Sequence, residues 1–289
     1  MTKRLLILLL LLCSSVLGQV PYQKPMMGQQ IDWNNPLSKG LVGYWLMNEG
    51  GGNIVQDLSG NGNDGVIGVG YQNESIWSTG KFGTCLGFPS ARDRMDVGAI
   101  PLLLDDSGNK TVNLFVQIVT TTGTYNGCFD TGIVVAGEVP TYPGMGIYTN
   151  YQGLNVRFAV AKNDVDYVIT PTHTLTLNTW HMLTGVFVKA TGTAYLYVDG
   201  NLIGSNTNAN VTSYAGDYFR VGQFSNYGLT GGSKADVLSF YNRALSAGEI
   251  ADLYRNPFGI IQPTFSVWWY SGIGGEPPAT FGQVIMISN

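Results

Sequence analysis

The sequence predicts an all-β protein in which two antiparallel sheets pack face to face as a sandwich, with one short helix. Three observations predict this class. Short apolar runs are separated by Gly, Asn and Asp along most of the chain, 39 glycines among 289 residues suit many tight turns, and one segment has clear helix signals. Charged residues make up only 12% of the chain, so its solubility depends on Asn, Thr and Ser.

Seven strands are expected from their content of β-branched and aromatic residues. They are residues 112–119, 132–136, 153–161, 166–169, 180–188, 193–198 and 218–222.

The clearest local feature is a hairpin over residues 194–203. Its Asp199-Gly200 pair supplies the positive φ that a tight turn between two strands requires. Because side chains alternate along a strand, the aliphatic residues are expected between the sheets and the tyrosines on an outer face. The first set is Ala194, Leu196 and Val198, and the second is Tyr195 and Tyr197.

The helix is predicted by a capping box. Ser246 stands three residues before Glu249, so each side chain can bond the backbone N–H of the other residue. The helix is expected to end before Asn256-Pro257, since the residue before a proline avoids helical conformation.

Three separated segments carry a resemblance to a known family. They are GLVGYWLMNEGGGNIVQDLSGNGNDGVIGVG at residues 40–70, NTWHMLTGVFVKATGTAYLYVDGNLIGS at 178–205 and DVLSFYNRALSAGEIADLY at 236–254. In this order they resemble the laminin-G-like branch of the concanavalin A-like jelly rolls. The resemblance implies a two-sheet antiparallel jelly-roll sandwich with a short helix after the last strand. It also implies binding more often than catalysis.

The two ends of the chain differ from its middle. Residues 1–18 combine a basic start with a short apolar run, which is typical of a secretory signal peptide. Residues 19–38 are expected to form a linker or extended N-terminal segment, residues 39–258 the jelly roll, and residues 259–289 an aromatic, strand-like tail. The protein is therefore expected to be secreted or at the cell surface, with no membrane span after signal cleavage.

The net charge of the chain and the apolar runs near its C-terminus limit the classes of partner that are expected. Removal of Lys3 and Arg4 with the signal would move the formal net charge from −4 to −6, which argues against nucleic acid. The uncharged apolar runs of the tail need strands to pair with, in their own sandwich or in another copy. Self-assembly is therefore one expectation, beside a glycan or an extracellular protein as partner.

Two cysteines remain after the signal. Cys85 and Cys128 both lie in strand-like segments, and an oxidising compartment favours a disulfide between them. The alternative is two buried free thiols.

A structural calcium ion is the predicted cofactor. Asp57, Asn61 and Asn63 offer oxygen ligands at close spacing, of the kind that calcium prefers. The family resemblance adds Glu49, near the first strand, and Asp236, at the start of the last. The alternative is that Asp57 and the Asn-Gly steps build a turn through side-chain to backbone hydrogen bonds.

A carbohydrate groove is predicted in the middle of the chain. Sugars stack an apolar face on aromatic rings and present hydroxyls to Asn and Arg, whereas aromatic residues on strands also serve in packing. The candidate residues are Tyr125, Asn126, Tyr142, Tyr148, Tyr151 and Arg157.

Catalysis is not expected. Glycosidases need two carboxylates beside the scissile bond, and the five glutamates form no such cluster. The function expected from the sequence is a secreted, non-catalytic binding module for carbohydrate or another extracellular surface. The alternative is a structural subunit of an extracellular filament that assembles through exchange of its N- and C-terminal strands. A glycoside hydrolase is a third hypothesis.

Overall fold

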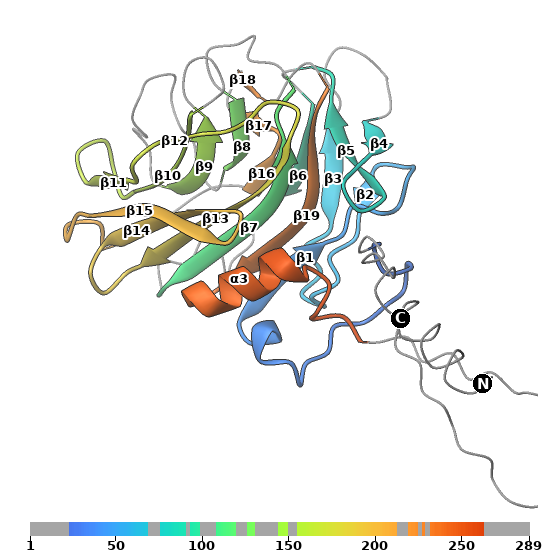
Figure 1. The fold of residues 1–289 in the computed structure, drawn as a ribbon, viewed down its shortest axis with the longest axis horizontal. Helices are drawn as coiled ribbons and strands as arrows, with labels where there is room; N and C mark the ends of the chain where they lie inside the picture. The colour runs from blue at the N-terminus through green and yellow to red at the C-terminus, as the bar shows by residue number, and fades with distance from the viewer. Residues whose placement is uncertain are drawn as a thin grey trace, which may run out of the picture.

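The structure, a computed structural model, describes residues 23–68, 76–90, 93–98, 108–119, 126–130, 144–149, 155–212, 219–224, 227–228 and 232–262. Within these residues two antiparallel sheets pack face to face, and one α-helix lies on the outer side of one of them (Figure 1). The predicted sandwich with one short helix is confirmed.

The first sheet has eight strands in the order β15-β14-β13-β7-β19-β5-β4, with β1 also paired to β19. The strands are β1 (Leu41–Trp45), β4 (Trp77–Thr79), β5 (Thr84–Phe88), β7 (Lys110–Gln117), β13 (Trp180–Val188), β14 (Thr193–Val198), β15 (Asn201–Thr207) and β19 (Ser233–Tyr241). β19 therefore lies inside the sheet and joins the C-terminal part of the described chain to three strands of its N-terminal half, β1, β5 and β7.

The second sheet has nine strands in the order β11-β10-β9-β8-β16-β6-β3-β2, with β12 paired to β10. The strands are β2 (Ile54–Val55), β3 (Gly65–Gly68), β6 (Arg94–Gly98), β8 (Asn126–Asp130), β9 (Gly144–Thr149), β10 (Asn155–Ala161), β11 (Tyr167–Ile169), β12 (His173–Thr174) and β16 (Phe219–Val221). A separate short ladder joins β17 (Gln223–Phe224) to β18 (Tyr227–Gly228).

The core between the sheets contains alternating side chains from most of the described strands. Ala194, Leu196 and Val198 of β14 belong to it, as predicted. Aromatic rings join the layers, because Phe219 of the nine-stranded sheet stacks on Trp45 at 5.7 Å and meets Phe240 edge-on at 5.9 Å.

A second apolar layer covers the outer face of the eight-stranded sheet. Tyr197 belongs to this layer and Tyr195 packs against it, which confirms that the hairpin tyrosines face outward from the sandwich. Helix α3 (Ala247–Arg255) lies over this layer and contributes Ile250 and Leu253 to it (Figure 1). This sheet is therefore buried on both faces.

The two ends of the described chain pair with each other beside this layer. Ile31 forms an isolated β-bridge with Ile261, and both are buried. The N–H of Asp32 donates to Ile260 at 2.8 Å, and the short 3-10 helix η1 (Pro36–Ser38) follows. Residues on both sides of the predicted 39–258 domain thus pack on the sandwich.

Helix α3 begins with the predicted capping box. The Ser246 hydroxyl accepts from the Glu249 N–H at 3.3 Å, while the Glu249 carboxylate accepts from the Ser246 N–H at 2.8 Å. Arg243 forms an ion pair with the same carboxylate at 2.7 Å. Burial opposes these contacts, yet they hold the pKa of Glu249 below its usual value.

We expect Ser246→Ala to lower the free energy of unfolding by about 0.5–2 kcal/mol, because the Glu249 N–H loses its acceptor. Chemical denaturation would measure the change. Ser205→Ala, at an exposed position of β15, is the matched control and is expected to change stability by less than about 0.5 kcal/mol. Equal effects of both substitutions would contradict a role for the cap.

Candidate functional site

The outer face of the nine-stranded sheet differs from that of its partner, since no described helix lies on it. The register defines its members. Val156, Phe158 and Val160 of β10 point into the core between the sheets, so Arg157 and Ala159 point outward. In β16, Phe219 and Val221 point inward and Arg220 outward by the same alternation.

An ionic triad lies on this face. Asp96 of β6 accepts from Arg220 Nε at 2.5 Å through Oδ1 and from Arg94 Nε at 2.6 Å through Oδ2. The side chains are partly hydrated, with exposed fractions of 31% for Asp96, 30% for Arg94 and 18% for Arg220. The triad brings two positive charges and one negative charge together.

An aromatic and cationic pair lies farther along the same sheet. Tyr148 of β9 faces Arg157 of β10 in the register, and the Arg157 guanidinium lies 5.1 Å from the centre of the Tyr148 ring. Tyr148 is 6% exposed. Arg157 Nε is buried and has no hydrogen-bond partner within the described part of the chain. Such a donor gains free energy from an acceptor that a ligand brings.

Small residues separate the pair from the triad. Gly146 and Ala159 face each other across β9 and β10, and Gly146 faces Asp130 of β8, which in turn faces Arg220. The triad strand β16 and the Arg157 strand β10 are three strand spacings of about 4.8 Å apart. Gly146 and Ala159 are themselves buried.

The predicted groove residues divide into three groups. Tyr148 and Arg157 are brought into contact, and Asn126 begins the adjoining strand β8, opposite Thr149. Tyr125, Tyr142 and Tyr151 lie outside the described residues. Arg94, Asp96 and Arg220 were not predicted, because only the pairing of β6 with β16 brings them together.

The predicted calcium ligands around Asp57 bond to the protein instead. Asp57 accepts from the N–H groups of Tyr44 and Ser59 at 3.0 and 2.9 Å and from the Asn63 N–H at 3.1 Å. Both Asn61 and Asn63 donate to the carbonyl of Val42. These bonds are those of the turn that was the alternative interpretation.

Calcium stays a prediction for this chain. The described residues contain no group of three or more His, Cys, Asp or Glu side chains suited to hold a metal. Thermal melting with a chelator and with excess calcium ions would test it, because an ion that binds the folded state raises the melting temperature.

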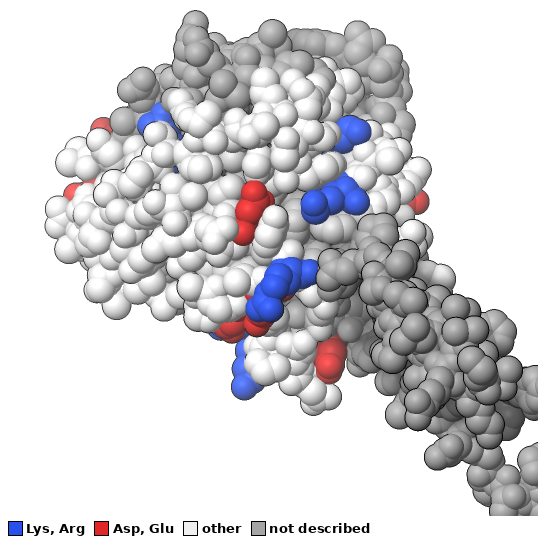
Figure 2. Space-filling model, in the orientation of Figure 1, with Lys and Arg blue, Asp and Glu red and all other residues white. Residues whose placement is uncertain are grey.

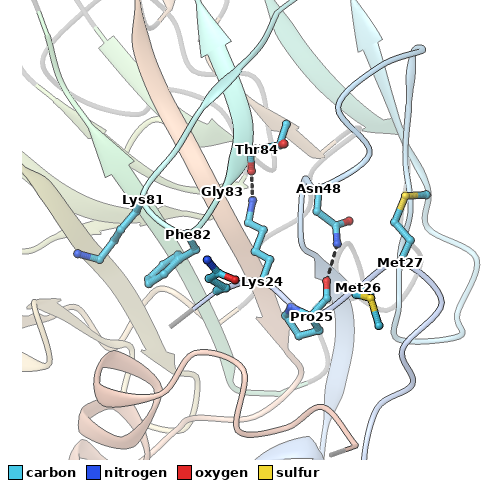
Figure 3. A pocket seen from close by; sticks show the side chains of 10 residues that line it. Lys24, Pro25, Met26, Met27, Asn48, Lys81, Phe82, Gly83 and Thr84 are labelled. Carbon is cyan, nitrogen blue, oxygen red and sulfur yellow. Dashed lines mark hydrogen bonds between the residues drawn. The ribbon is translucent and has the colours of Figure 1, made fainter. Parts of the chain in front are cut away.

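Asp236 faces a cation from its own chain. Its carboxylate forms a buried ion pair with Lys24, with side-chain exposed fractions of 0% for Asp236 and 4% for Lys24. Lys24 Nζ also donates to the carbonyl of Met47 at 3.0 Å and to that of Thr84, as Figure 3 shows for Thr84. A calcium ion at Asp236 would have to displace Lys24.

Lys24 belongs to a pocket of about 710 Å³ where residues 23–27 meet residues 81–84. Its side chain runs between Phe82 and Asn48 toward Thr84, whereas the Lys81 side chain points away (Figure 3). Desolvation lowers the pKa of Lys24 and raises the pKa of Asp236, and the attraction between the two groups opposes both shifts.

We expect Lys24→Met to destabilise the fold by about 3–5 kcal/mol, because it leaves the buried Asp236 carboxylate without its cation. Lys81→Met is the matched control. Its exposed side chain lies over the Phe82 ring, and its loss is expected to change stability by less than about 0.5 kcal/mol. Urea denaturation of both variants would measure the difference, and similar small losses would show that the Lys24 contact contributes little.

The predicted disulfide between Cys85 and Cys128 is wrong for this structure. Cys85 is a buried free thiol in β5, and it lies next to Gly80 and Asp236 on the outer side of the eight-stranded sheet. Cys128 belongs to β8 in the other sheet. Packed sheets are about 10 Å apart, beyond the Cα separation of about 7 Å that a disulfide allows. Burial and the Asp236 charge raise the pKa of the Cys85 thiol to about 12.

Comparison with known proteins identifies the family. The Laminin_G_3 family model, described as the concanavalin A-like lectin/glucanases superfamily, matches residues 92–251, more than half of the chain. The chain belongs to this superfamily. No curated protein matches the sequence significantly.

Solved structures share the superfamily's fold at low sequence identity. The binding domain of Paraclostridial Mosquitocidal Protein 1 has a TM-score of 0.59 and 14% identity over 77% of this chain and 53% of that one. The receptor binding domain of botulinum neurotoxin D has a TM-score of 0.58 and 13% identity over 81% and 56%. Trypanosoma rangeli sialidase in complex with sialic acid has a TM-score of 0.56 and 15% identity over 76% and 33%. The chain thus spans about half the length of the two toxin domains.

Two further observations concern surface and membrane. None of the helices in the described ranges is long and apolar enough to span a bilayer. On the face that Figure 2 shows, the described charged side chains are sparse and of mixed sign. The described part of this face therefore shows no large patch of charge of a single sign (Figure 2).

Proposed function

We propose that this chain is a secreted, non-catalytic binding module that recognises carbohydrate through the outer face of its nine-stranded sheet. One observation carries the proposal. The outer face of the eight-stranded sheet is covered by α3 and the chain ends, whereas the opposite face carries Tyr148, Arg157 and the Arg94–Asp96–Arg220 triad.

The side chains of this face suit a sugar ligand. Arg157 and the triad offer charged donors, and the Asp96 carboxylate accepts hydroxyl protons at the positions that the two arginines leave open. The Tyr148 ring lies against the Arg157 guanidinium and, although only 6% exposed, orients that cation on the outer face. Partial hydration of the triad means that a ligand replaces water rather than breaking a sealed core.

Structural neighbours support the class of function. They include the receptor binding domain of botulinum neurotoxin D, the binding domain of botulinum neurotoxin DC in complex with SialylT, and a sialidase in complex with sialic acid. Another extracellular surface, such as a glycosylated protein, would present the same chemistry.

A hydrolytic function has less support. Glycoside hydrolysis needs an acid and a second carboxylate on either side of the scissile bond. On the described outer face both carboxylate oxygens of Asp96 are already bonded, one to Arg94 and the other to Arg220, so neither oxygen stands free beside a second carboxylate. Asp130 of β8 is the ladder partner of Arg220 in β16.

We expect Arg157→Ala and Arg220→Ala each to weaken glycan binding by about 1–3 kcal/mol, the range for loss of an anchoring side chain. A glycan array on the purified protein would first identify a ligand, and calorimetry would then measure each affinity. Arg255→Ala on α3 is the matched control, because Arg255 is 72% exposed on the opposite side of the sandwich.

Thermal melting of the same variants separates binding from folding. A loss of affinity with an unchanged melting temperature supports the face as the site. Equal weakening by Arg255→Ala, or affinity losses that follow losses of stability, would contradict it.

A further inference from the structure

Lys24 and Asp236 form a buried pair that ligand binding does not use. They join the N-terminal segment to the last strand of the sandwich, and both side chains are almost fully withdrawn from water. A buried ion pair is a weak source of stability, because removing both charges from water costs about as much as their attraction returns. The surroundings of the pair point to a different state.

We propose that Lys24 Nζ and the Asp236 side-chain carboxyl condense into an intramolecular amide, an isopeptide bond, with release of one water molecule.

The surroundings of Lys24 orient a nucleophile. The carbonyl of Met47 lies 3.0 Å from Nζ, and that of Thr84 also accepts from it. A neutral amine has two N–H bonds and one lone pair. When the two N–H groups donate to these carbonyls, the lone pair is left for the third neighbour of Nζ, which is the Asp236 carboxyl.

The surroundings of Asp236 prepare an electrophile. Its Oδ2 accepts from the backbone N–H of Lys81 at 3.0 Å and from that of Phe82 at 3.3 Å. Two convergent backbone donors stabilise the negative charge that develops on a carbonyl oxygen under attack. Gly80 permits this approach, because a Cβ at that position would lie 2.5 Å from Oδ2.

Apolar neighbours favour the neutral forms that the condensation needs. Asp236 lies opposite Phe115 in the ladder, and Phe82 meets the rings of Phe115 and Phe258 at 5.0 and 5.2 Å. In such surroundings a proton passes from the ammonium to the carboxylate, because an uncharged pair avoids the desolvation of two ions. The lowered pKa of Lys24 and the raised pKa of Asp236, both due first to burial, agree with this transfer.

The atoms balance without a further reactant. Nζ attacks Cγ, and Oδ2 holds the negative charge of the tetrahedral intermediate against the two N–H groups. One amine proton moves to the Oδ1 hydroxyl, the Cγ–Oδ1 bond breaks and water leaves. The new amide keeps one N–H for a backbone carbonyl and a C=O for the Lys81 and Phe82 donors.

Glu49 is the residue that we assign to this proton transfer. Its Oε1 accepts from the Gln56 N–H at 2.8 Å, while its Oε2 is buried and has no hydrogen-bond partner in the described residues. Lys24 Nζ donates to the carbonyl of Met47, two residues before Glu49, and the Glu49 charge makes the smallest of the contributions that raise the pKa of Lys24 against its burial. A buried carboxylate with one free oxygen can take the amine proton and return it to the leaving hydroxyl.

Peptide mass spectrometry of the purified full chain tests the bond. Trypsin does not cut between Lys24 and Pro25, so Lys24 stays in the peptide that ends at Lys39, and Asp236 falls in the peptide Ala235–Arg243. The expected result is one joined species whose mass is the sum of the two peptides less one water. Two separate peptides at full mass, from protein shown to be folded by circular dichroism, would overturn the proposal.

Two substitutions refine the result. Lys24→Arg keeps a positive charge but removes the nucleophile, so the two peptides are expected to be separate and the melting temperature lower than that of the parent. A joined species in this variant would show that the link uses another residue and would overturn the assignment. Glu49→Gln keeps the acceptor for Gln56 and removes the proton acceptor, so separate peptides are expected to accumulate. Complete joining in Glu49→Gln would remove Glu49 from the mechanism.

Discussion

The structure depends on the covering of one face of the eight-stranded sheet. This sheet presents apolar side chains on both faces. Those on its outer face would remain in water without α3 and the two ends of the described chain, which include Ile31 and Ile261. Several contacts hold this cover: the Tyr44 hydroxyl donates to Pro257 at 2.8 Å, Ile31 bridges Ile261, and Lys24 reaches Asp236. Because the cover occupies this face, we propose the outer face of the nine-stranded sheet for ligand recognition.

Much of the fold could be predicted where local chemistry decides the structure. Strands β13 and β14 match the predicted residues 180–188 and 193–198, because β-branched and aromatic residues alternate there and the turn residues Asp199 and Gly200 adopt φ of 51° and 79°. Helix α3 was predicted from two residues of its capping box. Strand β9, in contrast, was not predicted, because two glycines stand in its first three residues and weaken the local signal, although β10 pairs with its whole length.

The candidate site was predicted only where residue type identifies it. Tyr148 and Arg157 were found because tyrosines, an asparagine and an arginine gather in the sequence between residues 125 and 157. The triad was not, since Asp96 and Arg220 are far apart in the chain and meet through a long-range ladder. The same limit explains the wrong disulfide, because a strand-like segment does not reveal which sheet it joins. Lys24 was missed because residues 19–38 show no periodic pattern, and burial of its side chain arises from contacts with residues 47, 84 and 236.

Solvation separates two clusters built from similar groups. Both place Asp against basic side chains, yet Asp96 is 31% exposed and Asp236 is fully buried. Water screens the triad, so its ion pairs are weak and can exchange for contacts with a ligand at little cost in stability. Around Asp236 there is no such exchange, and the pair must be satisfied by the chain itself, through its own N–H and carbonyl groups. The degree of burial, rather than the identity of the residues, therefore distinguishes a hydrated ionic cluster on one sheet from a buried pair that closes the fold on the other.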